Sequence, residues 1–165
     1  MFGYCIWYKI LDIHIINLIK ELSILLNTCA FNPHLTILYK LKECDFKLLE
    51  TYKKKKSPIF KIHGDIYQTS NNKFYAIQQD YMDINENKLY HISLAYRNGM
   101  KFTDDEIKLI KNLIKNKDLE VNNMTVKLYN CNSINCEEWI EINSPKGIKC
   151  LELLDCNLSY NSKNF

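Results

Sequence analysis

Hydrophobic side chains in three segments of the chain recur with the period of a helix. The first helix is predicted to begin near Asp12, a residue type that favours the N-cap, and to end before Pro33. Its buried stripe would consist of Ile15, Ile19, Leu22 and Leu26. A second helix is predicted over 45–55. A third, over 103–116, begins at the capping box Thr103-Asp104-Asp105-Glu106.

Alternation of apolar and polar positions predicts eight strands. They are 3–10, 34–40, 59–68, 73–79, 89–97, 124–130, 138–143 and 148–155. Because a helix lies between the first two strands, we expect a β-α-β unit whose parallel strands lie side by side or one strand apart. The pattern indicates the α/β (α+β) class, with two sheets or half-sheets and the helices outside.

Composition is that of a globular protein and leaves little room for disorder. The chain has 165 residues, 47% hydrophobic and 25% charged, which predicts a single domain over 1–158 and a polar tail over 159–165. A net charge of +3 is too small to indicate a nucleic-acid coat. With four glycines and no Gly-rich phosphate loop or nucleophile elbow, dinucleotide-binding and P-loop folds are not indicated.

Cysteine usage is typical of an intracellular protein. Seven cysteines, an odd number, occupy positions 5, 29, 44, 131, 136, 150 and 156, mostly in apolar segments. We expect reduced, buried thiols and no metal site, because zinc-knuckle spacing is absent. Charged residues interrupt the N-terminal apolar stretch, so neither a secretory signal nor a membrane span is expected.

The most informative motif is a heptapeptide that occurs twice, as His34-Leu35-Thr36-Ile37-Leu38-Tyr39-Lys40 and as His91-Ile92-Ser93-Leu94-Ala95-Tyr96-Arg97. On a strand, side chains alternate between the two faces. In each copy the imidazole and the hydroxyl therefore share one face, and the aliphatic residues share the other. The repeat predicts a two-fold site built on two half-buried strands.

These two His-x-Thr/Ser motifs, with the opening Tyr4-Cys5-Ile6-Trp7 and Phe31-Asn32-Pro33-His34, resemble the two-histidine (2H) phosphoesterase superfamily, in particular its small cyclic-nucleotide phosphodiesterase and RNA-ligase-like branch. The resemblance covers about 3–155 and implies a bilobal, pseudo-symmetric fold with a central cleft. The two histidines are 57 positions apart, which is short for the superfamily and suggests a trimmed connection between lobes.

The resemblance also implies the roles of particular residues. His34 and His91 would be the general acid and base, in an order that the sequence leaves open. Thr36 and Ser93 would bind the phosphoryl oxygens, without metal or cofactor. Trp7 and Tyr96 are suggested to flank the base or sugar. Strand alternation turns Tyr96 away from His91, however, so this contact requires a bulge or a strand end after Leu94.

The resulting hypothesis is a metal-independent phosphodiesterase for a ribose phosphodiester. The substrate could be a 2′,3′-cyclic phosphate, a 2′-5′ oligoadenylate or a cyclic dinucleotide. The alternative is a non-catalytic module that binds RNA ends or nucleotides. Abundant Lys, Asn and Ile suggest an AT-rich coding genome, and a viral source would favour destruction of a host nucleotide messenger. We expect a cytoplasmic protein, in the host cytoplasm if viral, with a nucleotide or short RNA as partner, no membrane association and no obligate protein partner.

Structural explanations are favoured for the two remaining histidines and for the lysine run. His63-Gly64-Asp65 is expected to form a bend, and His14 to be a surface or packing residue. Arg97, the only arginine, could hold a phosphate or be an exposed cation at a strand end. The cations of 53–56 fit a solvated helix end.

Overall fold

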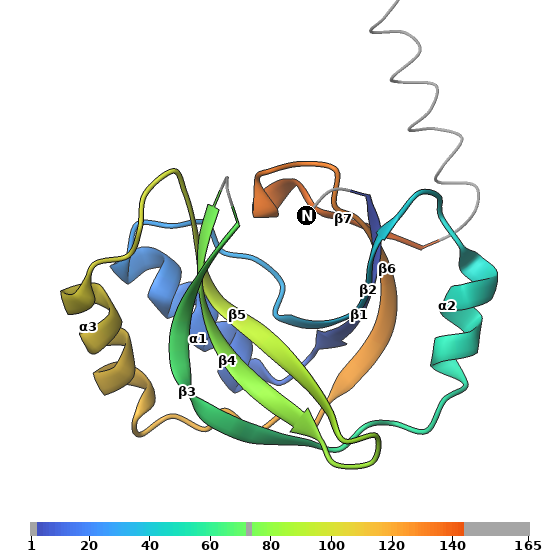
Figure 1. Ribbon diagram of the computed structural model, residues 1–165, viewed down its shortest axis with the longest axis horizontal. Coiled ribbons are helices and arrows are strands. Elements are labelled where there is room, and N and C mark those ends of the chain that lie inside the picture. The colour runs from blue at the N-terminus through green and yellow to red at the C-terminus, as the bar shows by residue number, and fades with distance from the viewer. Residues whose placement is uncertain (1–2, 72–73, 144–165) are drawn as a thin grey trace, which may run out of the picture.

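The computed structural model describes residues 3–71 and 74–143. In these ranges all strands join one antiparallel sheet in the order β3-β4-β5-β2-β1-β6-β7 (Figure 1). The strands are β1 (Tyr4–Ile10), β2 (His34–Leu41), β3 (Phe60–Asn71), β4 (Phe74–Asp83), β5 (Lys88–Asn98), β6 (Met124–Asn130) and β7 (Ile140–Ile142). The helices are α1 (Ile13–Leu25), α2 (Phe46–Lys53) and α3 (Asp104–Ile114), with a short 3-10 helix η1 (Cys136–Glu138).

All three predicted helices are present, but α1 ends at Leu25, earlier than the predicted stop at Asn32-Pro33. The stripe expected on α1 is buried, and α1 contacts β5. The Asp45 side chain caps α2, accepting a hydrogen bond from the backbone N–H of Leu48 at 2.8 Å. Thr103 and Glu106 form the expected capping box at the start of α3. In Figure 1, α2 and α3 lie at opposite sides of the view, outside the strands that they cover. None of the helices in the described ranges is long and apolar enough to span a membrane.

The first two strands are not parallel as predicted. β1 and β2 are adjacent and antiparallel. The segment after α1 returns to the end of β1 from which the helix left, where the N–H of Ile10 donates to the carbonyl of Pro33 at 2.9 Å. The helix and the segment after it therefore leave from and return to the same end of β1. As a result, β2 runs in the direction opposite to β1.

The two motif strands meet at the middle of the sheet through one registered pair, Leu35↔Ile92. On one side of this pair lie β3, β4 and β5, and on the other lie β2, β1, β6 and β7. The α/β class is thus confirmed and each half of the sheet carries one motif strand. Two separate sheets in a bilobal fold are not confirmed.

The aliphatic residues of the repeat are buried in the main hydrophobic core, as expected. Leu35, Ile92 and Leu94 are 0–1% exposed and pack in the same cluster as Ile6 and Ile10 of β1. A second, smaller cluster includes Trp7 and Tyr129, on the face of β1 opposite Ile6. Since strand side chains alternate, this second cluster lies on the face that carries the motif histidines.

The remaining strand predictions agree with the structure to different degrees. The strand 124–130 is confirmed as β6, and the hairpin predicted over 59–79 corresponds to β3 and β4. Of the predicted strand 138–143, residues Ile140–Ile142 form β7. The predicted strand 148–155 and the tail 159–165 lie outside the described residues.

Candidate functional site

The four polar motif residues lie together on one face of the β2–β5 junction. In an antiparallel pair, the register Leu35↔Ile92 places His34 opposite Ser93 and Thr36 opposite His91. His34 and Ser93 are each 4% exposed, Thr36 is half-buried, and His91 is exposed. The structure therefore brings all four predicted residues into one block, with an imidazole and a hydroxyl from each strand.

The ring of His34 is held in one tautomer. Its Nδ1 lies 2.8 Å from the carbonyl oxygen of Asn32, and a carbonyl can only accept, so Nδ1 carries the proton. Burial lowers the pKa of His34 to about 4; a charge on His91 would lower it too, while the Asn32 carbonyl opposes the shift. At neutral pH this imidazole is uncharged, with the Nε2 lone pair available as a proton acceptor.

Trp7 packs against one face of the His34 ring. The two rings are stacked with centroids 3.6 Å apart and an angle of 11°, and Tyr129 stacks on Trp7 at 4.1 Å. Trp7 is only 1% exposed, so it offers little surface to a ligand in this conformation. The suggested contact of Trp7 with a base or sugar stays a prediction; its evident contact is with the histidine.

A bulge places Tyr96 near the motif residues. Between β4 and β5, Ile77 pairs with Ala95 and Gln78 with Ser93, which leaves Leu94 as an extra residue. This is the irregularity that the sequence required if Tyr96 is to face the site. Burial raises the pKa of Tyr96 to about 12, and the Ser93 hydroxyl partly offsets this rise. Ser93 also accepts a hydrogen bond from the Gln78 amide at 3.4 Å.

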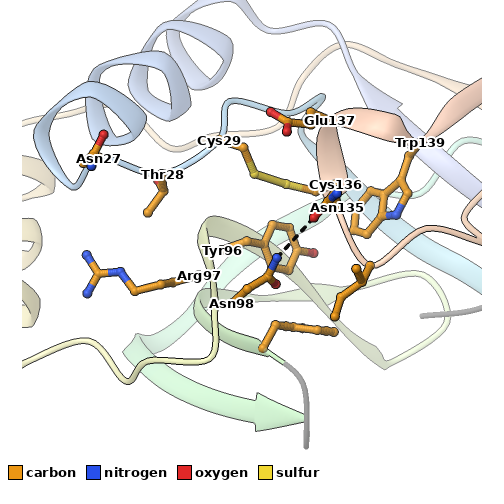
Figure 2. A pocket seen from close by; sticks show the side chains of 12 residues that line it. Asn27, Thr28, Cys29, Tyr96, Arg97, Asn98, Asn135, Cys136, Glu137 and Trp139 are labelled. Atoms are coloured by element: carbon orange, nitrogen blue, oxygen red, sulfur yellow. Dashed lines mark hydrogen bonds between the residues drawn. A yellow bond between two sulfur atoms is a disulfide. The ribbon is translucent and has the colours of Figure 1, made fainter.

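A pocket of about 280 Å³ has two neighbours of this block in its wall; Figure 2 shows the side chains that line the pocket. Its aromatic wall includes Tyr96 and Trp139, whose ring centroids are 5.6 Å apart. Trp139 also meets the ring of His34 edge-on at 6.0 Å. Trp139 therefore contacts the buried histidine and also lines the pocket.

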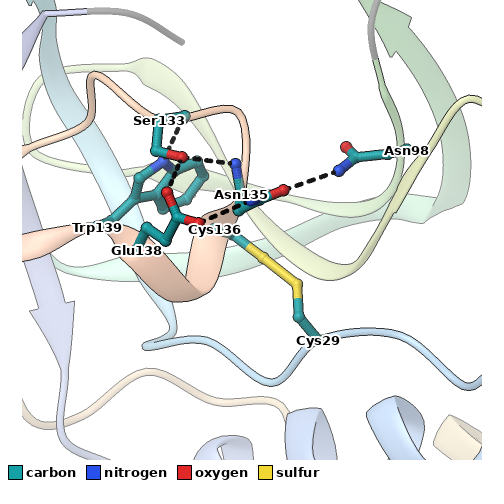
Figure 3. Close-up of a disulfide and its surroundings, with 7 residues drawn as sticks. All are labelled: Cys29, Asn98, Ser133, Asn135, Cys136, Glu138 and Trp139. Carbon is teal, nitrogen blue, oxygen red and sulfur yellow. Dashed lines mark hydrogen bonds between the residues drawn. A yellow bond between two sulfur atoms is a disulfide. The ribbon is translucent and has the colours of Figure 1, made fainter. Parts of the chain in front are cut away.

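The cysteine prediction is wrong for one pair. Cys29 and Cys136 form a disulfide in the pocket wall, not reduced thiols (Figure 3). Their separation of 107 residues hides the pairing in the sequence. They meet because Cys29 lies in the segment that leads into β2, while Cys136 lies in η1, beside Trp139. Cys5, Cys44 and Cys131 are outside this disulfide.

Arg97 is occupied by protein groups. Its guanidinium donates two hydrogen bonds to Glu106, at 2.6 and 3.0 Å, and one to the carbonyl of Leu26 at 3.0 Å. These interactions, with Arg97 first among them, lower the pKa of Glu106 to about 2. The structural interpretation of Arg97 therefore fits the structure better than a phosphate-binding one.

The other histidines lie outside the block. His63 precedes Gly64, whose φ of +67° accompanies an irregularity in the β3–β4 register, as expected for a bend. His14 lies on α1 with its Nε2 2.9 Å from the carbonyl of Glu120, in keeping with a surface residue. Among residues 3–71 and 74–143, no group of three or more His, Cys, Asp or Glu side chains is arranged to hold a metal ion.

Two groups near the block were missed by the sequence reasoning. Asp80 lies directly opposite His91 in the β4–β5 register, and Trp139 covers the edge of His34. The sequence gives no clear signal for Asp80, because residues 78–80 are consecutive polar residues and alternation does not single one of them out. No signal marks Trp139 either. Comparison with family models, curated proteins and solved structures finds no match to this chain.

Proposed function

We propose that this protein is a metal-independent phosphodiesterase that hydrolyses a ribose phosphodiester through His34 and His91. The observation that supports it most is the block of two imidazoles and two hydroxyls across the Leu35↔Ile92 junction. The same residues carry the resemblance to the 2H phosphoesterases. In this view the halves of the sheet on either side of the junction correspond to the two lobes of that fold.

The environments of the two histidines favour a division of roles. His34 is neutral at pH 7 with Nε2 unprotonated, as a general base requires. His91 is more exposed than His34; burial lowers its pKa, and the facing carboxylate of Asp80 opposes this shift and so favours the protonated form. We therefore assign His34 as the base and His91 as the acid.

The reaction can be written with every proton accounted for. His34 Nε2 takes a proton from water as the water oxygen forms a bond to phosphorus. The bond from phosphorus to one ribose oxygen breaks, and the proton of His91 passes to that oxygen. Thr36 and Ser93 donate hydrogen bonds to the non-bridging oxygens, whose charge grows in the transition state.

This mechanism requires that water and the substrate phosphoryl group reach the Nε2 atom of His34. His34 is 4% exposed, so little of its ring is open to a substrate in this conformation. Two residues of the pocket wall contact the block, Tyr96 at Ser93 and Trp139 at His34. We propose that a phosphoryl group approaches the imidazoles from the side of Tyr96 and Trp139. The substrate would then place its sugar or base near these two rings.

A panel of ribose phosphodiesters tests the proposal. We would incubate the protein, with and without EDTA, with 2′,3′-cyclic mononucleotides, 2′-5′ oligoadenylates and cyclic dinucleotides, and follow the products by chromatography. We expect at least one class to be hydrolysed, chelation to have no effect, and His34→Ala and His91→Ala each to lose about 10²–10⁴ in kcat.

The control is His14→Ala, which removes a surface imidazole and should keep wild-type turnover. Circular dichroism would establish that each variant is folded. Tight binding of a panel member without turnover by the wild type would overturn the enzyme and favour the nucleotide-binding module. Loss of turnover in EDTA would overturn the metal-independent mechanism.

A further inference from the structure

His91 faces one carboxylate across the β4–β5 pair, and this carboxylate is fixed by a third side chain. Asp80 is the direct cross-strand partner of His91, so both side chains project from the same face of the sheet. The Tyr67 hydroxyl donates to Asp80 Oδ1 at 2.8 Å. Tyr67 pairs with Gln78 across the β3–β4 register, so its hydroxyl reaches Asp80 diagonally, while Asp80 faces His91 of β5 directly.

The charges around His91 are few. From β2 it is faced by His34, which is neutral, and by the Thr36 hydroxyl. From β4 it is faced by Asp80, and on its own strand Ser93 is the next residue on the same face. His63 of β3 lies beyond Asp80 in the same row of the sheet. Burial lowers the pKa of His91, and Asp80 is the charged group that raises it.

We propose that Asp80, oriented by Tyr67, is a positioning residue that favours the protonated form of His91 for its role as the acid. It acts on His91 through its charge and is not assigned a contact with substrate. This inference rests on the proposed function, since it takes one histidine to be an acid. It deepens that function by naming what makes two nearly equivalent imidazoles unequal: burial and tautomer for His34, and a carboxylate for His91.

The physical requirement behind this proposal is a difference in protonation between neighbours. Two imidazoles in equal surroundings would share the first proton equally, and that proton would disfavour binding of a second. The carboxylate of Asp80 lies on the side of His91 that is away from His34 in the strand order. Its field therefore favours a proton on His91 first.

The test measures the pKa of His91 directly, so that it does not depend on turnover. Imidazole resonances of the wild type, Asp80→Asn and Asp80→Glu would be followed by NMR as a function of pH, with His91→Ala used for assignment. We expect Asp80→Asn to lower the pKa of His91 by about 0.5–1 unit. Asp80→Glu should restore most of the wild-type value.

Asp65→Asn is the matched control, because it removes one exposed carboxylate from neighbouring β3. It should leave the pKa of His91 unchanged. An unchanged pKa in Asp80→Asn, or an equal fall in Asp65→Asn, would overturn the proposal. If Asp80→Asn does not fold, Tyr67→Phe keeps the charge and removes the bond that orients it; we expect a smaller fall in the same direction, and no fall would overturn the proposal.

Kinetics separate this inference from the proposed function. An acid must be protonated, so activity is lost as pH rises through the pKa of His91. In Asp80→Asn this basic limb of the kcat profile should move to lower pH, with kcat at the acid side of the optimum retained. An unmoved limb with a lowered His91 pKa would overturn the role of His91 as acid. Absence of turnover in the wild type would overturn the enzyme while the NMR result still stands.

Discussion

At the residue scale, the most constrained group in the site is the imidazole of His34. The ring stacks on Trp7, and its Nδ1 donates a hydrogen bond to the carbonyl of Asn32. The ring of Trp139 packs against it at a steep angle. Each contact restricts a different freedom of the ring: its plane, its tautomer and its exposure to water. A ring held in this way pays little reorganisation when a proton moves, which is a property that catalysis requires.

The buried state of His34 predicts how stability depends on pH. Its pKa is about 4 in the folded chain against about 6.5 for an unperturbed histidine, so between these values the unfolded state binds more protons. The free energy of unfolding should therefore fall as pH is lowered through 6.5. Between pH 7.5 and 5.5 we expect a loss of about 1 kcal/mol from this residue.

Urea unfolding at the two pH values, followed by tryptophan fluorescence, measures this dependence. His34→Gln should be less stable at pH 7.5 but should show a pH dependence smaller by about 1 kcal/mol. A variant and wild type with equal pH dependence would contradict the burial of a neutral imidazole. His14→Gln serves as the control for removing a half-buried histidine outside the block.

The residues of the site could be predicted from the sequence because their information is local. Alternation on a strand is enough to place His34 with Thr36, and His91 with Ser93, on common faces. The positions of Asp80 and Trp139 beside the block could not be predicted in this way. They depend on which strands become neighbours and on the path of 131–139, which are set by tertiary packing.

At the element scale, β5 and α3 are joined by one network of charges. Glu106 accepts from Arg97 of β5 and also from the backbone N–H of Thr103, its partner in the capping box. A single carboxylate thus closes the first turn of α3 and attaches this turn to the end of a motif strand. Arg97 adds the carbonyl of Leu26, which includes the end of α1 in the network.

This arrangement predicts unequal effects of two substitutions. Thr103→Ala removes an N-cap and should lower the free energy of unfolding by about 1 kcal/mol. Glu106→Ala also leaves the guanidinium of Arg97 without its carboxylate, and we expect a loss of about 2 kcal/mol or more. Chemical denaturation measures both; equal losses would show that the Arg97 contact contributes nothing beyond the cap.

The elements differ in how well the sequence predicted them. Helices and their caps depend on neighbours within four residues, which explains the agreement at Asp45 and Thr103. The direction of β2 was wrong because a helix between two strands usually belongs to a parallel crossover, whereas here residues 26–33 return to Ile10. The Leu94 bulge could be anticipated only as a condition for Tyr96 to face the site.

At the scale of the whole molecule, the disulfide links segments that secondary structure does not connect. Cys29 precedes the strand of His34, and Cys136 lies beside the tryptophan that covers His34. The bond closes a large loop that contains β2 to β6. By restricting the unfolded chain, such a cross-link typically stabilises a fold by about 2–4 kcal/mol.

We predict a corresponding sensitivity to thiol reductants. Reduction with excess dithiothreitol should lower the free energy of unfolding of the wild type by about 2–4 kcal/mol. The double variant Cys29→Ser, Cys136→Ser should unfold at a lower urea concentration and should not respond to the reductant. A wild type with the same stability before and after reduction, verified by thiol titration, would contradict this contribution.

The single pair Leu35↔Ile92 also bears on how this chain could vary. Hydrogen-bonded neighbouring strands lie about 4.7–4.9 Å apart. Because β2 and β5 are paired, backbone hydrogen bonding sets the lateral distance between the two strands that carry the histidines. No connecting loop has to supply that distance. Insertions or deletions at the hairpin tips remote from this pair should leave the imidazoles in place, since doubling a loop costs only about 0.6 kcal/mol. The 57-residue interval between the histidines then reflects the length of the connecting segments and does not change the relative position of the two side chains.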